Sequence, residues 1–163
     1  MKNDKLKPEN LIASFLGLGY LPKAPGTWGS LGALGLYYLL PGEIFEFWNL
    51  LYYLPALLLF SLFAVFISSK AERSLGHDAP AIVIDEVCGF FTAASFLPKT
   101  FMVGIYAFVL FRVFDIAKPF PVNISQKLPR GWGIVVDDIL AGVYALILIQ
   151  IINLINPDFL FLI

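Results

Sequence analysis

The chain has 163 residues, of which 59% are hydrophobic and only 14% are charged, and its formal net charge is −1. This length allows one compact domain and not two, and an ordinary soluble domain carries far more charge. The near-neutral balance gives no indication of a nucleic-acid partner, and the single cysteine excludes an intramolecular disulfide. The composition indicates an integral membrane protein.

The N-terminal residues 1–10 are expected to form a polar cytoplasmic tail in front of the apolar domain. The stretch MKNDKLKPENL carries positive charge, but no apolar core follows directly and no small-residue cleavage site is present. These features argue against a removable signal peptide. Residues 1–163 are then expected to form a single membrane-embedded domain.

Five apolar segments follow along the chain: Trp28–Leu40, Phe47–Ser68, Ala81–Leu97, Phe101–Ala117 and Ile134–Ile155. Crossing a bilayer core takes about 20 helical residues, a length that the second and fifth segments reach. The first segment is too short to cross alone; it is either half-spanning and re-entrant, or it crosses together with Leu11–Leu21. The third and fourth segments, joined by a short turn with Pro98, predict a helical hairpin. The expected fold is an all-α, polytopic membrane bundle of four to five apolar segments.

The basic residues predict the orientation of this bundle. If the N-terminus is cytoplasmic and all five segments cross, ten of the eleven lysines and arginines fall on the cytoplasmic side, and only Lys99 falls opposite. This distribution follows the positive-inside rule. Most acidic residues fall on the same side, although acids contribute little to orientation. Their convergence therefore needs a separate reason.

Three acidic patches are predicted to meet at this face. Asp85 and Glu86 lie at the start of the third segment, Asp115 near the end of the fourth, and Asp137 and Asp138 one turn into the fifth. Carboxylates that lie close together at the edge of the membrane, where the dielectric constant is low, repel one another unless positive charge compensates them. An oxygen-only set of ligands suits Mg²⁺, whereas one histidine and one cysteine are too few for a typical zinc site.

A basic and acidic stripe supplies the second source of compensating charge. Arg112, Asp115 and Lys118 are three residues apart, so they share one helix face at the end of the fourth segment. Arginine and lysine bind anionic oxygens, and together with a metal they favour a phosphate ester as the substrate. Taken alone, the stripe is equally consistent with an interfacial ladder of ion pairs.

The glycine-rich stretch 17–34 adds a possible phosphate-binding turn. Gly26 and Thr27 predict a helix start with Thr27 as N-cap, where free N–H groups and Lys23 could meet a phosphate. The plain alternative is that the glycines serve packing alone. Small residues that would let another helix approach closely occur here and in the fifth segment: Gly29, Gly32, Ala33, Gly35, Ala141, Gly142 and Ala145.

Four ordered blocks resemble the phosphatidylglycerophosphatase A family: GYLPKAPGTWGSL, IDEVCGFF, FRVFDIAKPFPV and GWGIVVDDILAG. The resemblance extends from about Gly17 to Gly142. It implies Mg²⁺-dependent removal of the terminal phosphate of phosphatidylglycerophosphate, which gives phosphatidylglycerol. It also implies a multi-pass protein of the bacterial inner membrane, whose active site lies on the cytoplasmic face and whose partners are the lipid substrate and the bilayer.

The resemblance and the residue chemistry together predict the following roles. The expected Mg²⁺ ligands, direct or through water, are Asp85, Glu86, Asp137 and Asp138. The expected phosphate-binding residues are Lys23, Thr27, Arg112 and Lys118. Asp115 is expected to orient the side chains of Arg112 and Lys118. All five acids are candidate catalytic residues, and one of them is expected to act as general base on the attacking water.

Two other classes of protein remain open at this point. Intramembrane acids with a basic partner also describe a small cation transporter or proton relay, although a transporter places its charges near the bilayer midplane. The other alternative is a subunit that serves assembly alone. The oligomeric state is not predicted.

Overall fold

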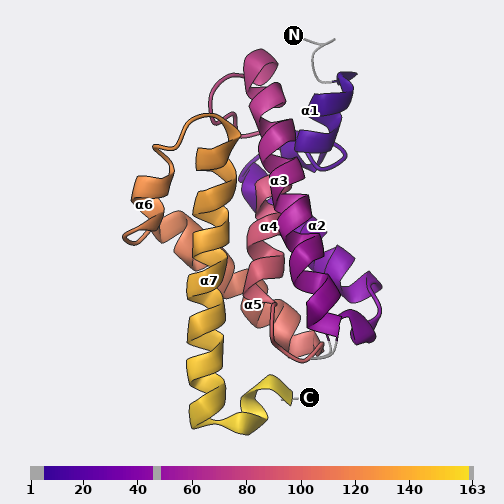
Figure 1. Ribbon diagram of the computed structural model, residues 1–163, viewed down its shortest axis with the longest axis vertical. Helices are drawn as coiled ribbons and strands as arrows, with labels where there is room; N and C mark the ends of the chain where they lie inside the picture. Colours follow the sequence, from indigo (N-terminus) through magenta and orange to yellow (C-terminus); the bar gives the residue numbers. More distant parts are fainter. Residues whose placement is uncertain (1–5, 46–48, 162–163) are drawn as a thin grey trace.

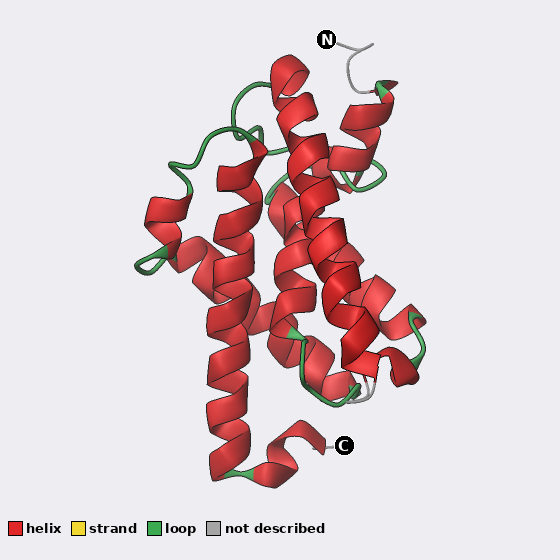
Figure 2. Cartoon of the chain, in the orientation of Figure 1, coloured by secondary structure: helices red, strands yellow, loops and turns green. Residues whose placement is uncertain are grey.

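The computed structural model describes residues 6–45 and 49–161, and all regular secondary structure in these ranges is helical (Figures 1 and 2). The α-helices are α1 (Pro8–Ala13), α2 (Pro25–Leu39), α3 (Leu50–Leu75), α4 (Ile84–Ala93), α5 (Phe101–Ala117), α6 (Val122–Ser125) and α7 (Gly131–Ile155). Short 3-10 helices are η2 (Leu18–Tyr20), η3 (Gly42–Phe45) and η5 (Pro157–Phe161). The all-α prediction is confirmed.

Two helices of the described chain are long and apolar enough to cross a membrane. They comprise Leu51–Leu75 and Gly131–Ile155, each with a mean hydropathy of 2.1. They correspond to the second and fifth apolar segments, the two that reach spanning length in the sequence. The candidate spans are fewer than the four to five segments of the expected bundle, because α2, α4 and α5 have only 15, 10 and 17 residues. Large apolar side chains on both long helices face outward, such as Leu51 at 74% and Leu154 at 80% exposure. The protein is membrane-associated.

Some helix boundaries match the prediction and others do not. Helix α5 has the predicted bounds, and the side chain of Thr100 caps it by accepting a hydrogen bond from the Val103 N–H at 3.1 Å. Helix α7 begins at Gly131, three residues before the expected start, so its two aspartates lie nearly two turns inside the helix. Residues 1–5 of the predicted tail, and Phe47 and Trp48 of the second segment, lie outside the described residues.

Helix ends from distant parts of the chain gather at one end of the molecule. In Figure 1, α1, the C-terminal end of α3 and the N-terminal end of α7 lie at one end of the molecule, and the C-terminus lies at the other. Lys99, in the turn between α4 and α5, donates to the carbonyl oxygen of Tyr38 at 3.2 Å and to that of Leu40. A lysine in this position satisfies carbonyl groups at the C-terminal end of α2.

The centre of the fold is α4, which packs against α7, α2, α3 and α5. The contact with α7 is unusually close, because a Cβ on Gly142 would lie 2.3 Å from the carbonyl oxygen of Gly89. Ala141 and Ala145 are completely buried beside it. The predicted close packing in α7 is therefore confirmed, and it brings the acidic ends of α4 and α7 together.

The predicted close approach along α2 is only partly correct. A Cβ on Gly29 would lie 2.7 Å from the Cβ of Val83, and one on Gly32 would lie 2.5 Å from the Cδ1 of Leu18. Ala33 is completely buried. No described atom lies within 4 Å of a Cβ built on Gly35, so the prediction for that residue is wrong.

We expect Gly142→Ala to lower the free energy of unfolding by about 1–3 kcal/mol, because the added methyl group would press on backbone atoms that cannot move aside easily. Gly35→Ala, which meets open space in the middle of α2, is expected to raise it by about 0.5–1 kcal/mol. Thermal unfolding of the two variants in detergent measures the contrast. Equal shifts would contradict the close α4–α7 contact.

Candidate active site

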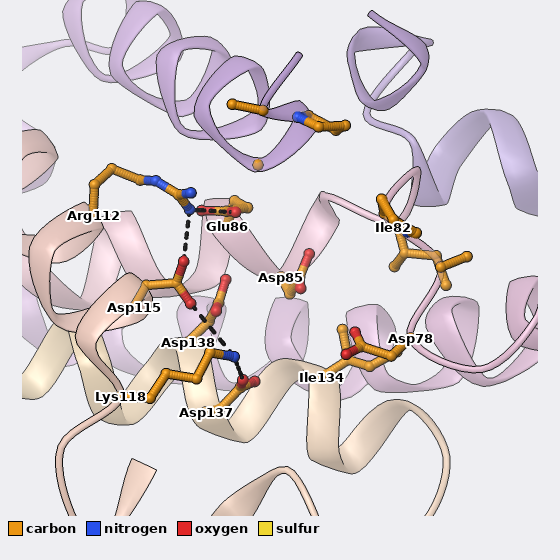
Figure 3. A pocket seen from close by; sticks show the side chains of 15 residues that line it. Asp78, Ile82, Asp85, Glu86, Arg112, Asp115, Lys118, Ile134, Asp137 and Asp138 are labelled. Atoms are coloured by element: carbon orange, nitrogen blue, oxygen red, sulfur yellow. Dashed lines mark hydrogen bonds and ion pairs between the residues drawn. The ribbon is translucent and has the colours of Figure 1, made fainter. Parts of the chain in front are cut away.

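A polar pocket of about 290 Å³ lies where α2, α4, α5 and α7 meet (Figure 3). Its lining includes five carboxylates and two basic side chains: Asp85, Glu86, Arg112, Asp115, Lys118, Asp137 and Asp138. The structure thus brings together the three acidic patches and the basic stripe that the sequence singled out.

Three helices deliver the acids to the pocket. Asp85 and Glu86 are in the first turn of α4, and Asp115 is in the last turn of α5. Asp137 and Asp138 come from the second turn of α7. All five side chains are buried, with residue exposures between 3% and 9%. Carboxylates at this depth need partners or a cation, because an uncompensated buried charge is costly.

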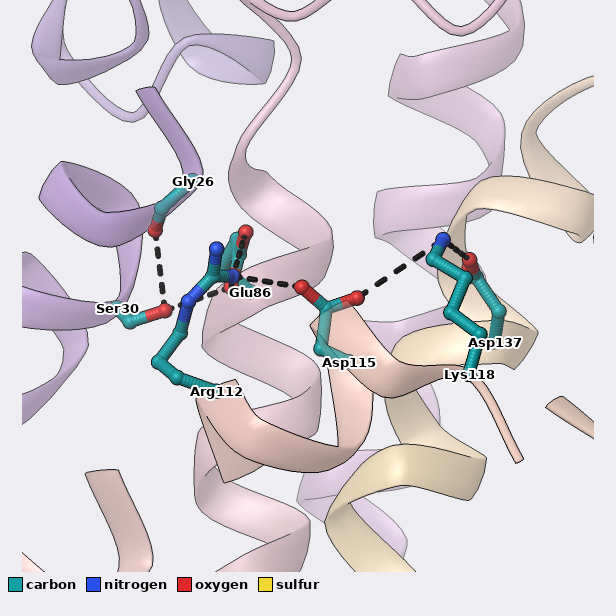
Figure 4. A network of polar contacts seen from close by, with 7 residues as sticks. All are labelled: Gly26, Ser30, Glu86, Arg112, Asp115, Lys118 and Asp137. Carbon is teal, nitrogen blue, oxygen red and sulfur yellow. Dashed lines mark hydrogen bonds and ion pairs between the residues drawn. The ribbon is translucent and has the colours of Figure 1, made fainter. Parts of the chain in front are cut away.

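Arg112 compensates one side of the pocket (Figure 4). Its Nη1 donates to both oxygens of Glu86, at 2.5 and 2.6 Å, and to Asp115 Oδ2 at 2.8 Å. The hydroxyl of Ser30, on α2, lies 2.6 Å from Glu86 Oε2. The oxygens of Glu86 are therefore already occupied by an arginine and a serine.

Lys118 compensates the other side. Its Nζ lies 2.7 Å from Asp137 Oδ2 and 4.0 Å from Asp115 Oδ1, so Asp115 stands between the two basic groups (Figure 4). Burial alone would lower the pKa of Lys118, but the hydrogen bond and charge of Asp137, with the charge of Asp115, raise that pKa above its ordinary value. Lys118 remains protonated and available to an anion.

Several carboxylate oxygens are left over for a metal ion. Asp115, Asp137 and Asp138 each offer one oxygen, and these atoms lie within 4.8 Å of one another. Among the described residues, Asp85 Oδ1, Asp137 Oδ1 and Asp138 Oδ2 are buried without a hydrogen-bond partner. Orphaned buried oxygens call for an explanation, and a hard cation provides one. These oxygens fit Mg²⁺. The group of three includes Asp115, which was not among the expected ligands, and leaves out Asp85 and Glu86, which were.

The two acids of α4, a helix that is not one of the two candidate spans, show how strongly the site is desolvated. Burial, followed by the charges of Glu86 and Asp137, raises the pKa of Asp85 well above its ordinary value. Burial also raises the pKa of Glu86, to about 7, although the positive charge of Arg112 acts in the opposite direction. A cation in the pocket would oppose both shifts.

The predictions for the start of α2 are wrong in detail. The N-cap residue is Ala24, no side chain caps the helix, and Thr27 lies inside its first turn. Neither Lys23 nor Thr27 is among the described residues that line the pocket, whereas Pro25 and Gly26 are. The N-terminal end of α2 thus borders the pocket through Ala24, Pro25 and Gly26, none of which has a polar side chain.

The sequence pattern singled out neither Ser30 nor Asp78. Ser30 lies four residues after Gly26, so both share the helix face that meets Glu86, a spacing that the sequence displays. Asp78 lines the pocket from the loop before α4, where Glu72 Oε1 accepts a hydrogen bond from its backbone N–H at 3.2 Å.

A desolvated pocket with free carboxylate oxygens for a hard cation, and two basic groups for an anion, is suited to phosphoester hydrolysis. Fold and site together define a membrane-associated hydrolase of this kind. The chain belongs to the phosphatidylglycerophosphatase A family, whose sequence profile matches residues 11–153. It is therefore a phosphatase that hydrolyses a phosphate monoester.

Three relatives illustrate this membership. Phosphatidylglycerophosphatase A of Haemophilus influenzae is 39% identical over 151 residues, covering 88% of each chain. Phosphatidylglycerophosphatase A of Escherichia coli is 35% identical over 139 residues, covering 83% of this chain and 78% of the relative. A Bacteroides thetaiotaomicron protein with the provisional name phosphatidylinositol-3-phosphatase is 38% identical over 149 residues, covering 86% and 91%. No solved structure matches the chain at a significant level.

Proposed function

We propose that the chain hydrolyses phosphatidylglycerophosphate to phosphatidylglycerol and inorganic phosphate in a Mg²⁺-dependent reaction. The observation that carries this proposal is a single pocket lined both by Lys118 and Arg112 and by buried carboxylate oxygens that have no hydrogen-bond partner among the described residues. The names of the Haemophilus influenzae and Escherichia coli relatives support this substrate. The name of the Bacteroides thetaiotaomicron relative supplies the comparison substrate, phosphatidylinositol 3-phosphate.

In this proposal the basic residues bind the phosphate. Lys118 Nζ offers a point charge, and Arg112 offers the planar guanidinium that matches phosphate oxygens. Asp115, which contacts both, keeps their nitrogen atoms in place. Fixed positive groups aimed at the phosphoryl oxygens stabilise the charge that develops there during transfer.

The remaining carboxylates divide into metal ligands and a base. Asp115, Asp137 and Asp138 would hold Mg²⁺, and the bound ion would neutralise phosphate charge and make a bound water more acidic. Asp85 lies outside that group and has a free Oδ1, which suits it to take a proton from the attacking water. The water oxygen bonds to phosphorus as the bond to the glycerol oxygen breaks, and the proton passes to the leaving alcohol.

The lipid would be held at the membrane edge of the pocket. Outward-facing apolar side chains adjoin the basic stripe, with Val113 at 51%, Ile116 at 71% and Phe120 at 72% exposure. Acyl chains can stay in the bilayer beside α5 while the headgroup reaches Lys118. In this proposal the face lies on the cytoplasmic side of the bacterial inner membrane, in a single multi-pass domain, and the distribution of basic residues supports the cytoplasmic orientation.

The alternatives of a transporter and an assembly subunit fit less well. Asp85 and Asp115 lie in terminal turns of their helices, whereas a transporter needs charges near the midplane. Membership in a phosphatase family also favours the enzyme.

The test is phosphate release by the purified chain, reconstituted in lipid vesicles or detergent. Phosphatidylglycerophosphate and phosphatidylinositol 3-phosphate are supplied in turn, with Mg²⁺ or with a chelator. We expect release from phosphatidylglycerophosphate that stops with the chelator and returns when excess Mg²⁺ is added. Preference for the inositol lipid would contradict the proposed substrate, and unchanged release in the chelator would contradict the metal.

A further inference from the structure

Ser30, inside the apolar helix α2, contacts a carboxylate on another helix, although the backbone of its own helix already offers its hydroxyl an acceptor. Ser30 is completely buried, and its Oγ lies 2.6 Å from Glu86 Oε2 and 3.0 Å from the carbonyl oxygen of Gly26. A hydroxyl has one proton to donate, and the shorter contact is to the ionisable group. Ser61, also buried, donates to the carbonyl oxygen of Leu57 in its own helix at 2.8 Å, the usual arrangement.

Glu86 is held from three directions as a result. Ser30 contacts Oε2, and Arg112 Nη1 contacts both oxygens. On the third side lies Gly26, where an added Cβ would be only 2.1 Å from Glu86 Oε1. The absence of a side chain at this position leaves the room that the carboxylate occupies.

The orientation of Arg112 depends on this arrangement. Nη1 is taken by Glu86 and Asp115, while the buried Nε has no partner in the described part of the chain. Because the guanidinium is planar and rigid, fixing Nη1 also fixes the directions of its remaining N–H groups. A shift of the Glu86 carboxylate would therefore turn the arginine relative to the phosphate.

We infer that Ser30 is a positioning residue of the phosphatase site: through Glu86 it sets the orientation in which Arg112 meets the substrate phosphate. This inference rests on the proposed function, since the orientation matters only if Arg112 binds that phosphate. It also gives Glu86 the role of holding the arginine, in place of the metal-ligand role expected from the sequence.

The experiment is a double-mutant cycle of Ser30→Ala and Glu86→Gln, measured as kcat and KM for phosphatidylglycerophosphate at saturating Mg²⁺. Ser30→Ala is expected to lower kcat/KM on the order of tenfold, the usual effect of losing one hydrogen bond to a charged group. In the Glu86→Gln protein the same change is expected to have little further effect, because the group through which Ser30 acts has already been altered. Ser61→Ala is the matched control and is expected to behave as wild type.

A second variant covers the case in which Ser30→Ala fails to fold. Ser30→Cys nearly keeps the side-chain volume and replaces the hydroxyl by a weak donor, so it is expected to lose activity to a similar extent. Full activity of Ser30→Cys, or an equal loss from Ser30→Ala in both backgrounds, would overturn the inference and leave the proposed function intact. A wild-type protein that releases no phosphate from phosphatidylglycerophosphate would overturn both.

Discussion

Asp138→Asn is expected to reduce phosphate release from phosphatidylglycerophosphate by more than about a thousandfold. Asp138 is 3% exposed, and its Oδ2 is an orphaned oxygen beside Asp115 and Asp137. Asparagine keeps the shape of the side chain but removes its charge. It also replaces one carboxylate oxygen by an NH2 group, which donates hydrogen bonds and cannot coordinate a cation. Initial rates at several Mg²⁺ concentrations measure the loss.

Stability should move in the opposite direction. The pocket gathers more acids than bases, so removing one negative charge relieves repulsion, and the unfolding temperature of Asp138→Asn is expected to stay equal or to rise. Asp158→Asn, an exposed aspartate in η5, is the matched control and should retain wild-type activity. Half of the wild-type rate in Asp138→Asn would contradict a place for Asp138 in the metal group.

The environment of the shorter apolar segments could not be predicted, because apolarity does not distinguish lipid from protein surroundings. The apolar run 81–97 looks like a membrane segment, yet every residue of α4 except Thr92 is buried inside the bundle. A helix that is apolar all round is buried in some environment, and only the packing shows which. The bounds of α5 were predictable, because Thr100 supplies a cap at one end and Pro119 stops the helix beyond the other.

The members of the site were easier to predict than their partners. Charged residues are rare in an apolar chain, so Asp85, Asp137 and Asp138 stood out by composition alone. The contact of Glu86 with Ser30 joins residues that are 56 apart in sequence, and the sequence around either residue does not indicate that the two meet. The error at Thr27 had a local signal, since a proline at N1 marks the helix start at Pro25.

Arg112→Gln is expected to lower kcat/KM for phosphatidylglycerophosphate about a hundredfold to a thousandfold, the usual cost of removing one preorganised charged donor. It should also lower the free energy of unfolding by about 3 kcal/mol, because Glu86 would lose the arginine that compensates its buried charge and Asp115 would lose the nearer of its two basic partners. Arg112→Lys is expected to recover part of both, since lysine supplies the charge but not the planar fork. Arg73→Gln, on the exposed last turn of α3, is the control.

The two effects can be separated by adding Glu86→Gln to Arg112→Gln. The double variant no longer has an unpaired Glu86 charge, so most of the stability is expected to return, while activity stays low because the phosphate still lacks its guanidinium. Unfolding temperature and phosphate release, measured on the same preparations, give the comparison. Recovery of activity together with stability would mean that Arg112 serves the fold alone, and Lys118 would then be the basic residue that binds the phosphate.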